Sequence, residues 1–135
     1  MPKSKGFTVL ELCLIIVIIS IITFLIINIY QNIIDKMTFS MAKNNLAVLQ
    51  RQIWMYYTLE GKYPDTLFEL IHKGYLKEIP LLNIKYHPPT RNVVVSDQPY
   101  DNTTDLGVWY YEYKSGIIKI ACTHKDLEGV EIYKW

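Results

Sequence analysis

A long apolar segment near the N-terminus restricts what this chain can fold into more than any other feature. Residues 7–27, FTVLELCLIIVIISIITFLII, contain a single carboxylate, Glu11, and no charged side chain lies between Glu11 and Asp35. As an α-helix, the 21 residues of this run are about 32 Å long, which matches the roughly 30 Å hydrocarbon core of a bilayer. We therefore expect residues 7–34 to be a membrane-spanning helix and residues 35–135 to be a water-soluble domain.

The residues that flank the apolar run predict its orientation. Lys3 and Lys5 precede it, and basic residues favour the cytoplasmic side, so the domain is expected in the periplasm or outside the cell. The residues that follow the run, NIYQNIIDKM, contain no small-x-small cleavage site. The segment is therefore expected to stay attached to the domain.

The domain itself carries no net charge. All but two of the 14 Lys and Arg residues, and all but one of the 13 Asp and Glu residues, follow Ile34. A neutral domain has no excess of positive charge that would attract the phosphates of a nucleic acid. No Ser/His/Asp arrangement, glycine-rich phosphate loop or carboxylate pair stands out either, so we expect the protein not to be an enzyme.

Glu11 lies near the edge of the apolar run and needs a partner there. An ionised side chain at the centre of a membrane helix costs about 2.5–3.5 kcal/mol, and less near its end. The next base along the chain is Lys36, which is out of reach on the same helix. The partner is therefore expected to be the N-terminus of the chain itself or a second copy of the protein.

The residues KGFTVLE and the apolar run behind them resemble the prepilin-type leader of type IV pilins and type II secretion pseudopilins. The resemblance implies that residues 1–6 are a leader peptide, which a prepilin peptidase cuts after Gly6. It also implies that Phe7 becomes an N-methylated first residue, and that Glu11 pairs with the N-terminal amine of a neighbouring subunit. Many members of the family have a glycine or proline part-way along this helix, whereas residues 7–34 have neither.

An amphipathic pattern continues beyond the apolar run and predicts that the helix extends over residues 35–60. Gly61 is expected to end it. A plain membrane anchor joined to an amphipathic helix fits this periodicity equally well. The predicted buried stripe, with spacings near three and four, consists of Ile34, Met37, Met41, Leu46, Leu49, Ile53 and Tyr56.

A short helix is predicted next, over about residues 66–73. Thr66 and Glu69 have the spacing of a capping box, and Gly74 is expected to end the helix. The surrounding residues resemble the YP-x-x-L-x-x-L…GYL…P stretch of major, G-type pseudopilins.

The remaining chain, about residues 83–134, contains short runs of residues that favour β-strands. Two short β-prone runs, IKYH and NVVVS, are separated by Pro88-Pro89. Two further runs, GVWYYEY and IIKIA, flank a turn at residues 114–116 and predict a hairpin. The run GVEIYKW could form one last strand. The hairpin resembles the GWYY…G hairpin of several pseudopilins and minor pilins, and its aromatic side chains are expected to pack in the core. We therefore expect the α+β pilin fold, with a long N-terminal helix on a small antiparallel sheet of three or four strands.

The candidate metal ligands are few. Asp97, Asp101 and Asp105 lie in the loop SDQPYDNTTDLG, whose oxygen-rich composition suits Ca²⁺. The resemblance to major pseudopilins, which bind calcium in a C-terminal loop, implies the same ion, although a solvated turn fits the loop better. The histidines His72, His87 and His124 are scattered, which argues against zinc or a general base. Cys13 lies inside the apolar run and Cys122 lies far from it in the soluble domain, so we do not expect them to form a disulfide with each other.

The resemblance implies a structural role. Subunits would leave the inner membrane, pack their apolar helices against copies of themselves and against other pseudopilins, and form a periplasmic pseudopilus for type II protein secretion. An inner-membrane assembly platform would be a further partner. A type IV pilus or DNA-uptake subunit has the same architecture, and a single-pass membrane-anchored binding domain is an alternative of another class.

Overall fold

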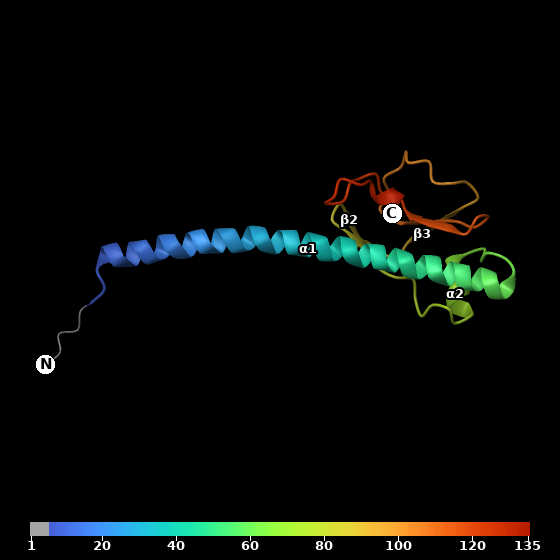
Figure 1. Cartoon of the computed structure of the whole chain (residues 1–135), viewed down its shortest axis with the longest axis horizontal. Helices are drawn as coiled ribbons and strands as arrows, with labels where there is room; N and C mark the ends of the chain where they lie inside the picture. The colour runs from blue at the N-terminus through green and yellow to red at the C-terminus, as the bar shows by residue number, and fades with distance from the viewer. Residues whose placement is uncertain (1–5) are drawn as a thin grey trace. The chain divides into compact units, whose positions relative to one another are not determined.

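The computed structural model describes residues 6–135, so Lys3, Lys5 and all of the expected leader except Gly6 lie outside the described residues. The chain is an α+β protein that divides into two compact units, Met1–Ile34 and Asp35–Trp135. Its elements (Figure 1) are α1 (Val9–Glu60), α2 (Leu67–His72), β1 (Leu82–Ile84), β2 (His87–Thr90), β3 (Val93–Ser96), β4 (Trp109–Glu112), β5 (Ile117–Ile120) and the 3₁₀-helix η1 (Ile132–Lys134).

The first unit contains the apolar part of α1, which is long and apolar enough to cross a membrane. The side chains of Ser20, Thr23 and Asn28 within it bond to the helix itself. Ser20 Oγ donates to the Ile16 carbonyl at 2.7 Å, and Asn28 Nδ2 donates to the Phe24 carbonyl at 2.9 Å. Because lipid offers no hydrogen-bond partners, internal bonding of this kind is what a membrane segment requires.

The second unit is built on the remaining part of α1, which ends at Glu60 and is followed by Gly61 with φ +75°, as predicted. The predicted stripe was right from Leu46 onward and wrong before it, because Met37 and Met41 are 55% and 62% exposed. Steps of three and four back from Leu46 lead to other residues. The buried stripe is Phe39, Ala42, Leu46, Leu49, Ile53 and Tyr56.

Helix α2 packs beside α1 and begins without the predicted capping box. Thr66 occupies the N-cap position, but its side chain makes no capping hydrogen bond. The Glu69 carboxylate instead accepts the Asp65 backbone N–H at 3.2 Å and the Tyr56 hydroxyl at 2.6 Å. The Glu69 side chain therefore links α2 to α1 by a hydrogen bond. Gly74, with φ +80°, follows the end of α2 as expected.

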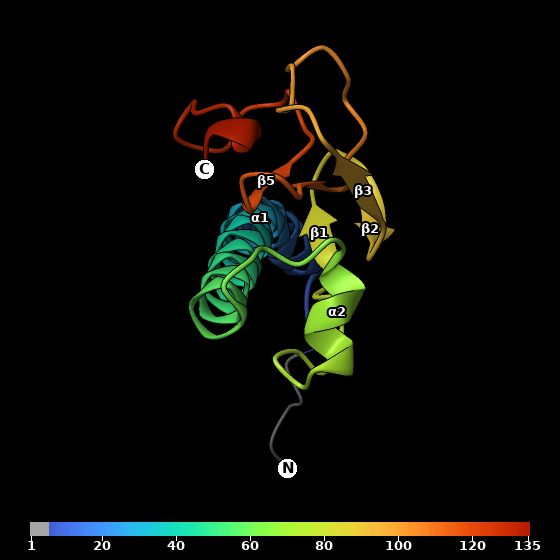
Figure 2. The same ribbon diagram turned by 90° about the vertical axis from the view of Figure 1, so that its right-hand side faces the viewer.

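The strands form two small sheets instead of one antiparallel sheet (Figure 2). β1 and β2, both labelled in that view, are antiparallel. Pro88-Pro89 lies inside β2 and does not separate two strands. In the second sheet, β4 pairs antiparallel with β5, as the predicted hairpin requires, but parallel with β3. Parallel neighbours need a crossover connection, and residues 97–108 supply it.

Two of the three aromatic residues of β4 are core residues, as predicted. Trp109 and Tyr111 are fully buried on one face of the strand. Their polar atoms find backbone partners, since Trp109 Nε1 donates to the Pro80 carbonyl at 2.9 Å and the Tyr111 hydroxyl donates to the Pro64 carbonyl at 2.7 Å. The hairpin thereby holds the proline-flanked segment that contains α2.

The C-terminal segment forms η1 and not the expected last strand. Asp126, which is nearly buried, organises the turn before it by accepting the backbone N–H groups of Glu128 and Val130. Its second oxygen accepts Lys43 Nζ of α1 at 3.1 Å and Trp135 Nε1 at 3.0 Å. Across this tight turn, Lys125 and Glu131 form an isolated antiparallel bridge in place of a strand.

Candidate functional site

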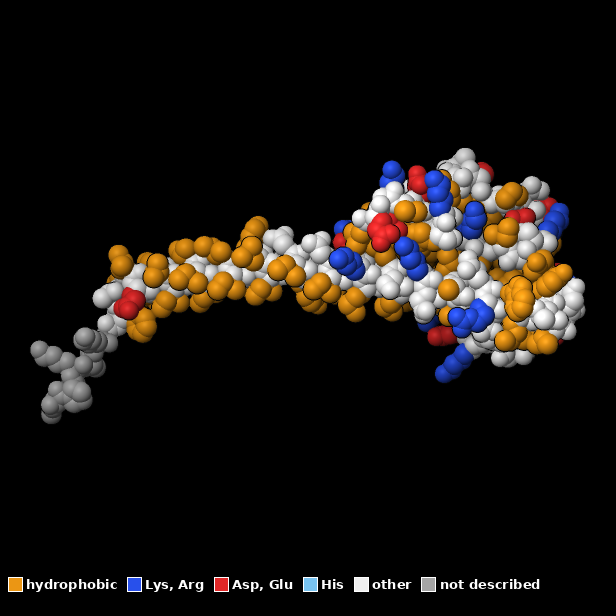
Figure 3. Space-filling model, in the orientation of Figure 1, with side chains coloured by type: hydrophobic (Ala, Val, Ile, Leu, Met, Phe, Trp, Pro, Cys, Tyr) orange, Lys and Arg blue, Asp and Glu red, His pale blue; other side chains and the backbone are white. Residues whose placement is uncertain are grey.

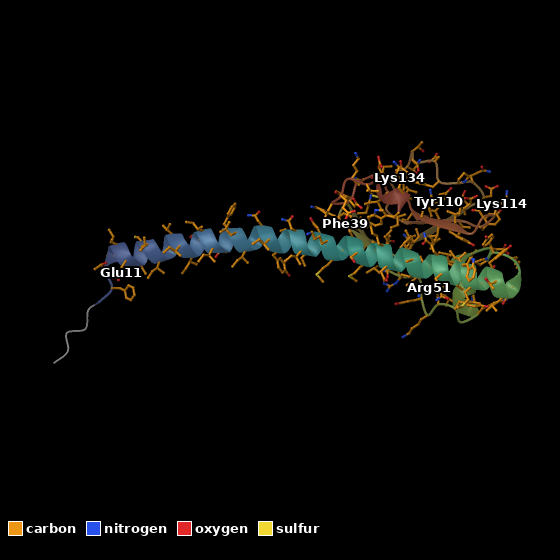
Figure 4. All side chains as sticks on the ribbon, viewed as in Figure 1. Glu11, Phe39, Arg51, Tyr110, Lys114 and Lys134 are labelled. Carbon is orange, nitrogen blue, oxygen red and sulfur yellow. The ribbon has the colours of Figure 1, made fainter. Side chains whose placement is uncertain are left out.

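The three residues of the expected processing and assembly site lie at the beginning of α1. Gly6 and Phe7 precede the helix, and the Phe7 side chain is 72% exposed. Glu11 lies in the first turn and is exposed (Figure 4). Cleavage after Gly6 and methylation of Phe7 are chemical events that stay predictions.

Glu11 has a partner within its own chain that the sequence reasoning missed. Its Oε2 accepts the Thr8 backbone N–H at 3.4 Å, and the Thr8 Oγ1 accepts the Glu11 backbone N–H at 3.2 Å. This is a capping box, which satisfies two of the N–H groups that a helix start leaves unpaired. The T-x-x-E spacing at the start of an apolar run was the signal that could have found it.

The rest of the first unit is an apolar surface. Every residue from Val9 to Ile34 is exposed, and on the face shown in Figure 3 hydrophobic side chains extend along the apolar part of α1. No charged side chain lies between Glu11 and Asp35. Such a surface is stable only when lipid or other apolar helices cover it.

The acidic loop does not gather its three carboxylates. Asp97 pairs with Lys114 Nζ at 3.1 Å, and Asp101 accepts the backbone N–H and the hydroxyl of Thr103. Within residues 6–135, neither acid belongs to a cluster of metal-ligating side chains. The candidate calcium site that combined them with Asp105 is therefore not assembled in this structure.

Asp105 lies instead in a cluster with two histidines and a cysteine, so the description of the histidines as scattered was wrong for two of the three. Its Oδ1 lies 3.1 Å from His87 Nε2, and its Oδ2 lies 3.1 Å from His124 Nδ1. Cys122 Sγ lies 3.5 Å from the same His124 nitrogen. Only the Cys122-x-His124 spacing pointed to this cluster, because residues two apart on an extended chain share a side.

The surroundings of the cluster shift two of its pKa values in opposite directions. Burial alone would raise the pKa of the Asp105 carboxyl, but the Thr123 N–H and the two imidazoles more than offset this and hold it below its usual range. Burial raises the pKa of the Cys122 thiol to about 11. The cluster therefore combines a carboxylate with a protonated thiol at neutral pH.

Comparison with known proteins adds no relative. The chain matches no protein-family model, no curated protein and no solved structure at a significant level. The proposals below therefore rest on the residues and their geometry.

Proposed function

We propose that this chain is a pilin-like structural subunit, specifically a pseudopilin of a type II secretion system. The observation that carries the proposal is the first unit of the chain. It exposes apolar side chains on all sides, and its one ionisable acid lies in the first helical turn, five residues after a glycine. A filament subunit needs this combination, because lipid chains must cover its apolar surface before assembly and the helices of neighbouring subunits must cover it afterwards.

Assembly then exchanges one apolar environment for another. In the inner membrane, with the N-terminus in the cytoplasm, lipid chains cover the helix. In the filament, neighbouring helices replace the lipid, and van der Waals packing between helices provides the attraction. Because apolar packing is not directional, Glu11 supplies the register by binding the N-terminal amine of the next subunit, which prepilin peptidase exposes at Phe7.

The capping bond of Glu11 is compatible with this role. A distance of 3.4 Å makes the bond to the Thr8 N–H a long and weak one. It uses Oε2, and a carboxylate accepts further donors through its other oxygen. A charged amine from a neighbour would form a shorter and stronger hydrogen bond than a backbone N–H does.

The capping box also favours a second candidate, a single-pass membrane anchor that carries a binding domain. In that protein Glu11 would cap its own helix and would need no neighbour. Subunits of a type IV pilus or of a DNA-uptake filament share every feature used above. Interaction with an outer-membrane secretin, or with a DNA-uptake apparatus, distinguishes the two kinds of filament.

Processing tests the proposal most directly. The protein is purified from membranes of cells that contain a prepilin peptidase, and its N-terminal peptide is identified by mass spectrometry. We expect an N-methylated Phe7 as the first residue in the wild type, and retention of residues 1–6 in a Gly6→Leu variant. A wild-type protein that begins at Met1 or Pro2 would contradict the filament proposal and favour the anchored domain.

A further inference from the structure

The cluster of His87, Asp105, Cys122 and His124 is independent of the N-terminal site and has no part in the proposed assembly. One ligand atom from each of the four residues lies within 4.8 Å of all the others. His87 begins β2, Asp105 lies in the crossover between β3 and β4, and the other two residues follow β5. Three segments that are far apart in the sequence thus bring metal-ligating atoms to one point.

The distances within the cluster suit a tetrahedral ion. Zinc binds His nitrogen, carboxylate oxygen and Cys sulfur at about 2.0–2.3 Å, so tetrahedral ligands lie about 3.3–3.6 Å from one another. In the cluster, His87 Nε2 lies 3.1 Å from Asp105 Oδ1, His124 Nδ1 lies 3.1 Å from Asp105 Oδ2, and Cys122 Sγ lies 3.5 Å from His124 Nδ1. Nitrogen and sulfur ligands select zinc over calcium or magnesium, which take oxygen ligands.

The structure also holds these side chains in place. The Thr123 backbone N–H donates to Asp105 Oδ1 at 3.0 Å, and the Tyr86 ring stacks on the His124 ring with 4.2 Å between centroids. His87 packs so closely on Gly107 that a Cβ there would lie 2.2 Å from the His87 Cγ. Outer contacts of this kind orient metal ligands.

The cluster lies at the surface of the domain but is not fully open. Cys122 is completely buried, and the side chains of His87, Asp105 and His124 are 13%, 31% and 40% exposed. An ion therefore has access past His124 and Asp105, while the sulfur forms the inner wall. Solvent exposure thus increases from the buried thiol to the outer imidazole and carboxylate, which is compatible with an entry path for the ion.

We propose that His87 Nε2, Asp105, Cys122 Sγ and His124 Nδ1 bind one zinc ion as a closed structural site. Four protein ligands leave no open position for a substrate, which distinguishes a structural from a catalytic zinc site. The ion links the hairpin of β1 and β2, the crossover and the C-terminal segment. A domain of about a hundred residues has a small core, so such a link contributes much to its stability.

Binding follows a simple proton balance. The Cys122 thiol loses its proton to solvent as the Zn–S bond forms, while both histidines ligate as neutral imidazoles. In the metal-bound form the proton of each neutral imidazole lies on the other ring nitrogen, Nδ1 of His87 and Nε2 of His124, so the protons that face the Asp105 carboxylate in the metal-free form leave those ligand nitrogens. No electron is transferred, and the affinity is expected to fall as the pH falls, since protons compete with the metal for its ligands.

The test uses the full chain in detergent micelles, after chelator treatment and dialysis. We expect one Zn²⁺ per chain by isothermal titration, a higher Tm with zinc, and with Co²⁺ as probe an intense thiolate-to-metal absorption with the visible bands of a tetrahedral ion. Cys122→Ser and His124→Ala should each weaken zinc binding about 100-fold or more, since even outer-shell contacts are worth 10–100-fold. His72→Ala and Cys13→Ser, which alter residues outside the cluster, should leave it unchanged.

Three results would overturn the proposal. They are a wild-type chain that binds no stoichiometric zinc, a Co²⁺ spectrum without a thiolate band, and an equal loss of binding in His72→Ala. Circular dichroism of the metal-free variants identifies any that fail to fold. In that case the wild-type Co²⁺ spectrum alone decides, because it needs no substitution.

Discussion

Thr8 and Glu11 cap the start of α1 reciprocally, with each side chain accepting the backbone N–H of the other residue. A negative charge in the first turn is also favoured by the helix dipole. An acid that looks out of place in an apolar run therefore has a local structural reason to be there. The proposed role of Glu11 in assembly is separated from this capping role by experiment.

Substitution of Glu11 by glutamine makes that separation. Glutamine also serves in a capping box, so Glu11→Gln keeps the cap and removes only the charge. We expect normal membrane insertion but a filament yield lower by about ten-fold or more, since a hydrogen bond to a charged group contributes about 1.5–3 kcal/mol. Immunoblots of membrane and sheared-filament fractions measure both quantities, and Glu11→Val should behave in the same way.

Thr8→Ala is the matched control for the cap. It keeps the carboxylate and removes one capping side chain, at a cost of about 1 kcal/mol to the helix start. We expect nearly normal filament yield. If Thr8→Ala assembled poorly while Glu11→Gln assembled normally, the function of Glu11 would be capping and not assembly.

The hydrogen bond from Tyr56 to Glu69 should contribute measurably to the stability of the domain. It is 2.6 Å long, joins α1 to α2, and with burial raises the pKa of Tyr56 to about 12. We expect Tyr56→Phe to lower the free energy of unfolding by about 1–3 kcal/mol, because the partner is charged. Urea denaturation of the full chain in micelles measures this, with Tyr57→Phe, half-exposed on the same helix, expected to change it little.

Gly107 and Gly129 form a pair that separates steric clash from backbone strain. Both have positive φ, +65° and +82°, but a Cβ at Gly107 would overlap His87 whereas a Cβ at Gly129 would meet nothing within 4 Å. Both alanine variants should lose about 1–2 kcal/mol from strain. Gly107→Ala should lose clearly more, and the zinc affinity should fall only in that variant; equal thermal shifts would mean that His87 moves aside freely.

The environment of the Asp126 carboxyl leads us to expect that the domain loses stability in acid. Burial tends to raise the pKa of its carboxyl, but the Val130 and Glu128 N–H groups, Lys43 and Trp135 hold it below its usual range. A depressed native pKa means that the stabilisation is present above the unfolded value of about 3.9 and is lost as the pH falls through the native value. The wild-type Tm should therefore decrease below about pH 4.

The variant Asp126→Asn isolates this contribution. It should be less stable by about 1–3 kcal/mol at neutral pH, because the Lys43 ammonium loses its charged partner. Its Tm should also depend less on pH in the acid range than the wild-type Tm does. Glu128→Gln, in the same turn but exposed, serves as the control, and parallel pH profiles of Asp126→Asn and wild type would contradict the assignment.

The features that sequence predicted well are those set by local chemistry. Gly61 and Gly74 follow helices because glycine accepts the positive φ at these positions, and the turn at residues 114–116 follows from the two strands around it. The buried stripe of α1 was correct only from Leu46 onward. Nearer the first unit, spacings of three and four allow several sets of apolar residues, and only tertiary contacts select Phe39 and Ala42 over the methionines.

The features that escaped prediction depend on distant segments. The parallel pairing of β3 with β4 leaves no local signature, because it results from where the crossover packs. The cluster around Asp105 is assembled by the same crossover, which brings it to His87 and to the residues after β5. The Asp126 turn replaced the last strand for a similar reason, since its charge is satisfied by Lys43, far earlier in the chain.

The two prolines of β2 have a consequence for the proposed filament subunit. Within residues 6–135, β2 pairs with β1 alone, and Pro88 and Pro89 are exposed on it. Proline has no backbone N–H, so this edge offers fewer donors to a strand from another molecule. If copies crowd together as the proposed assembly requires, this edge disfavours joining through their sheets into insoluble aggregates and leaves association to the apolar helices.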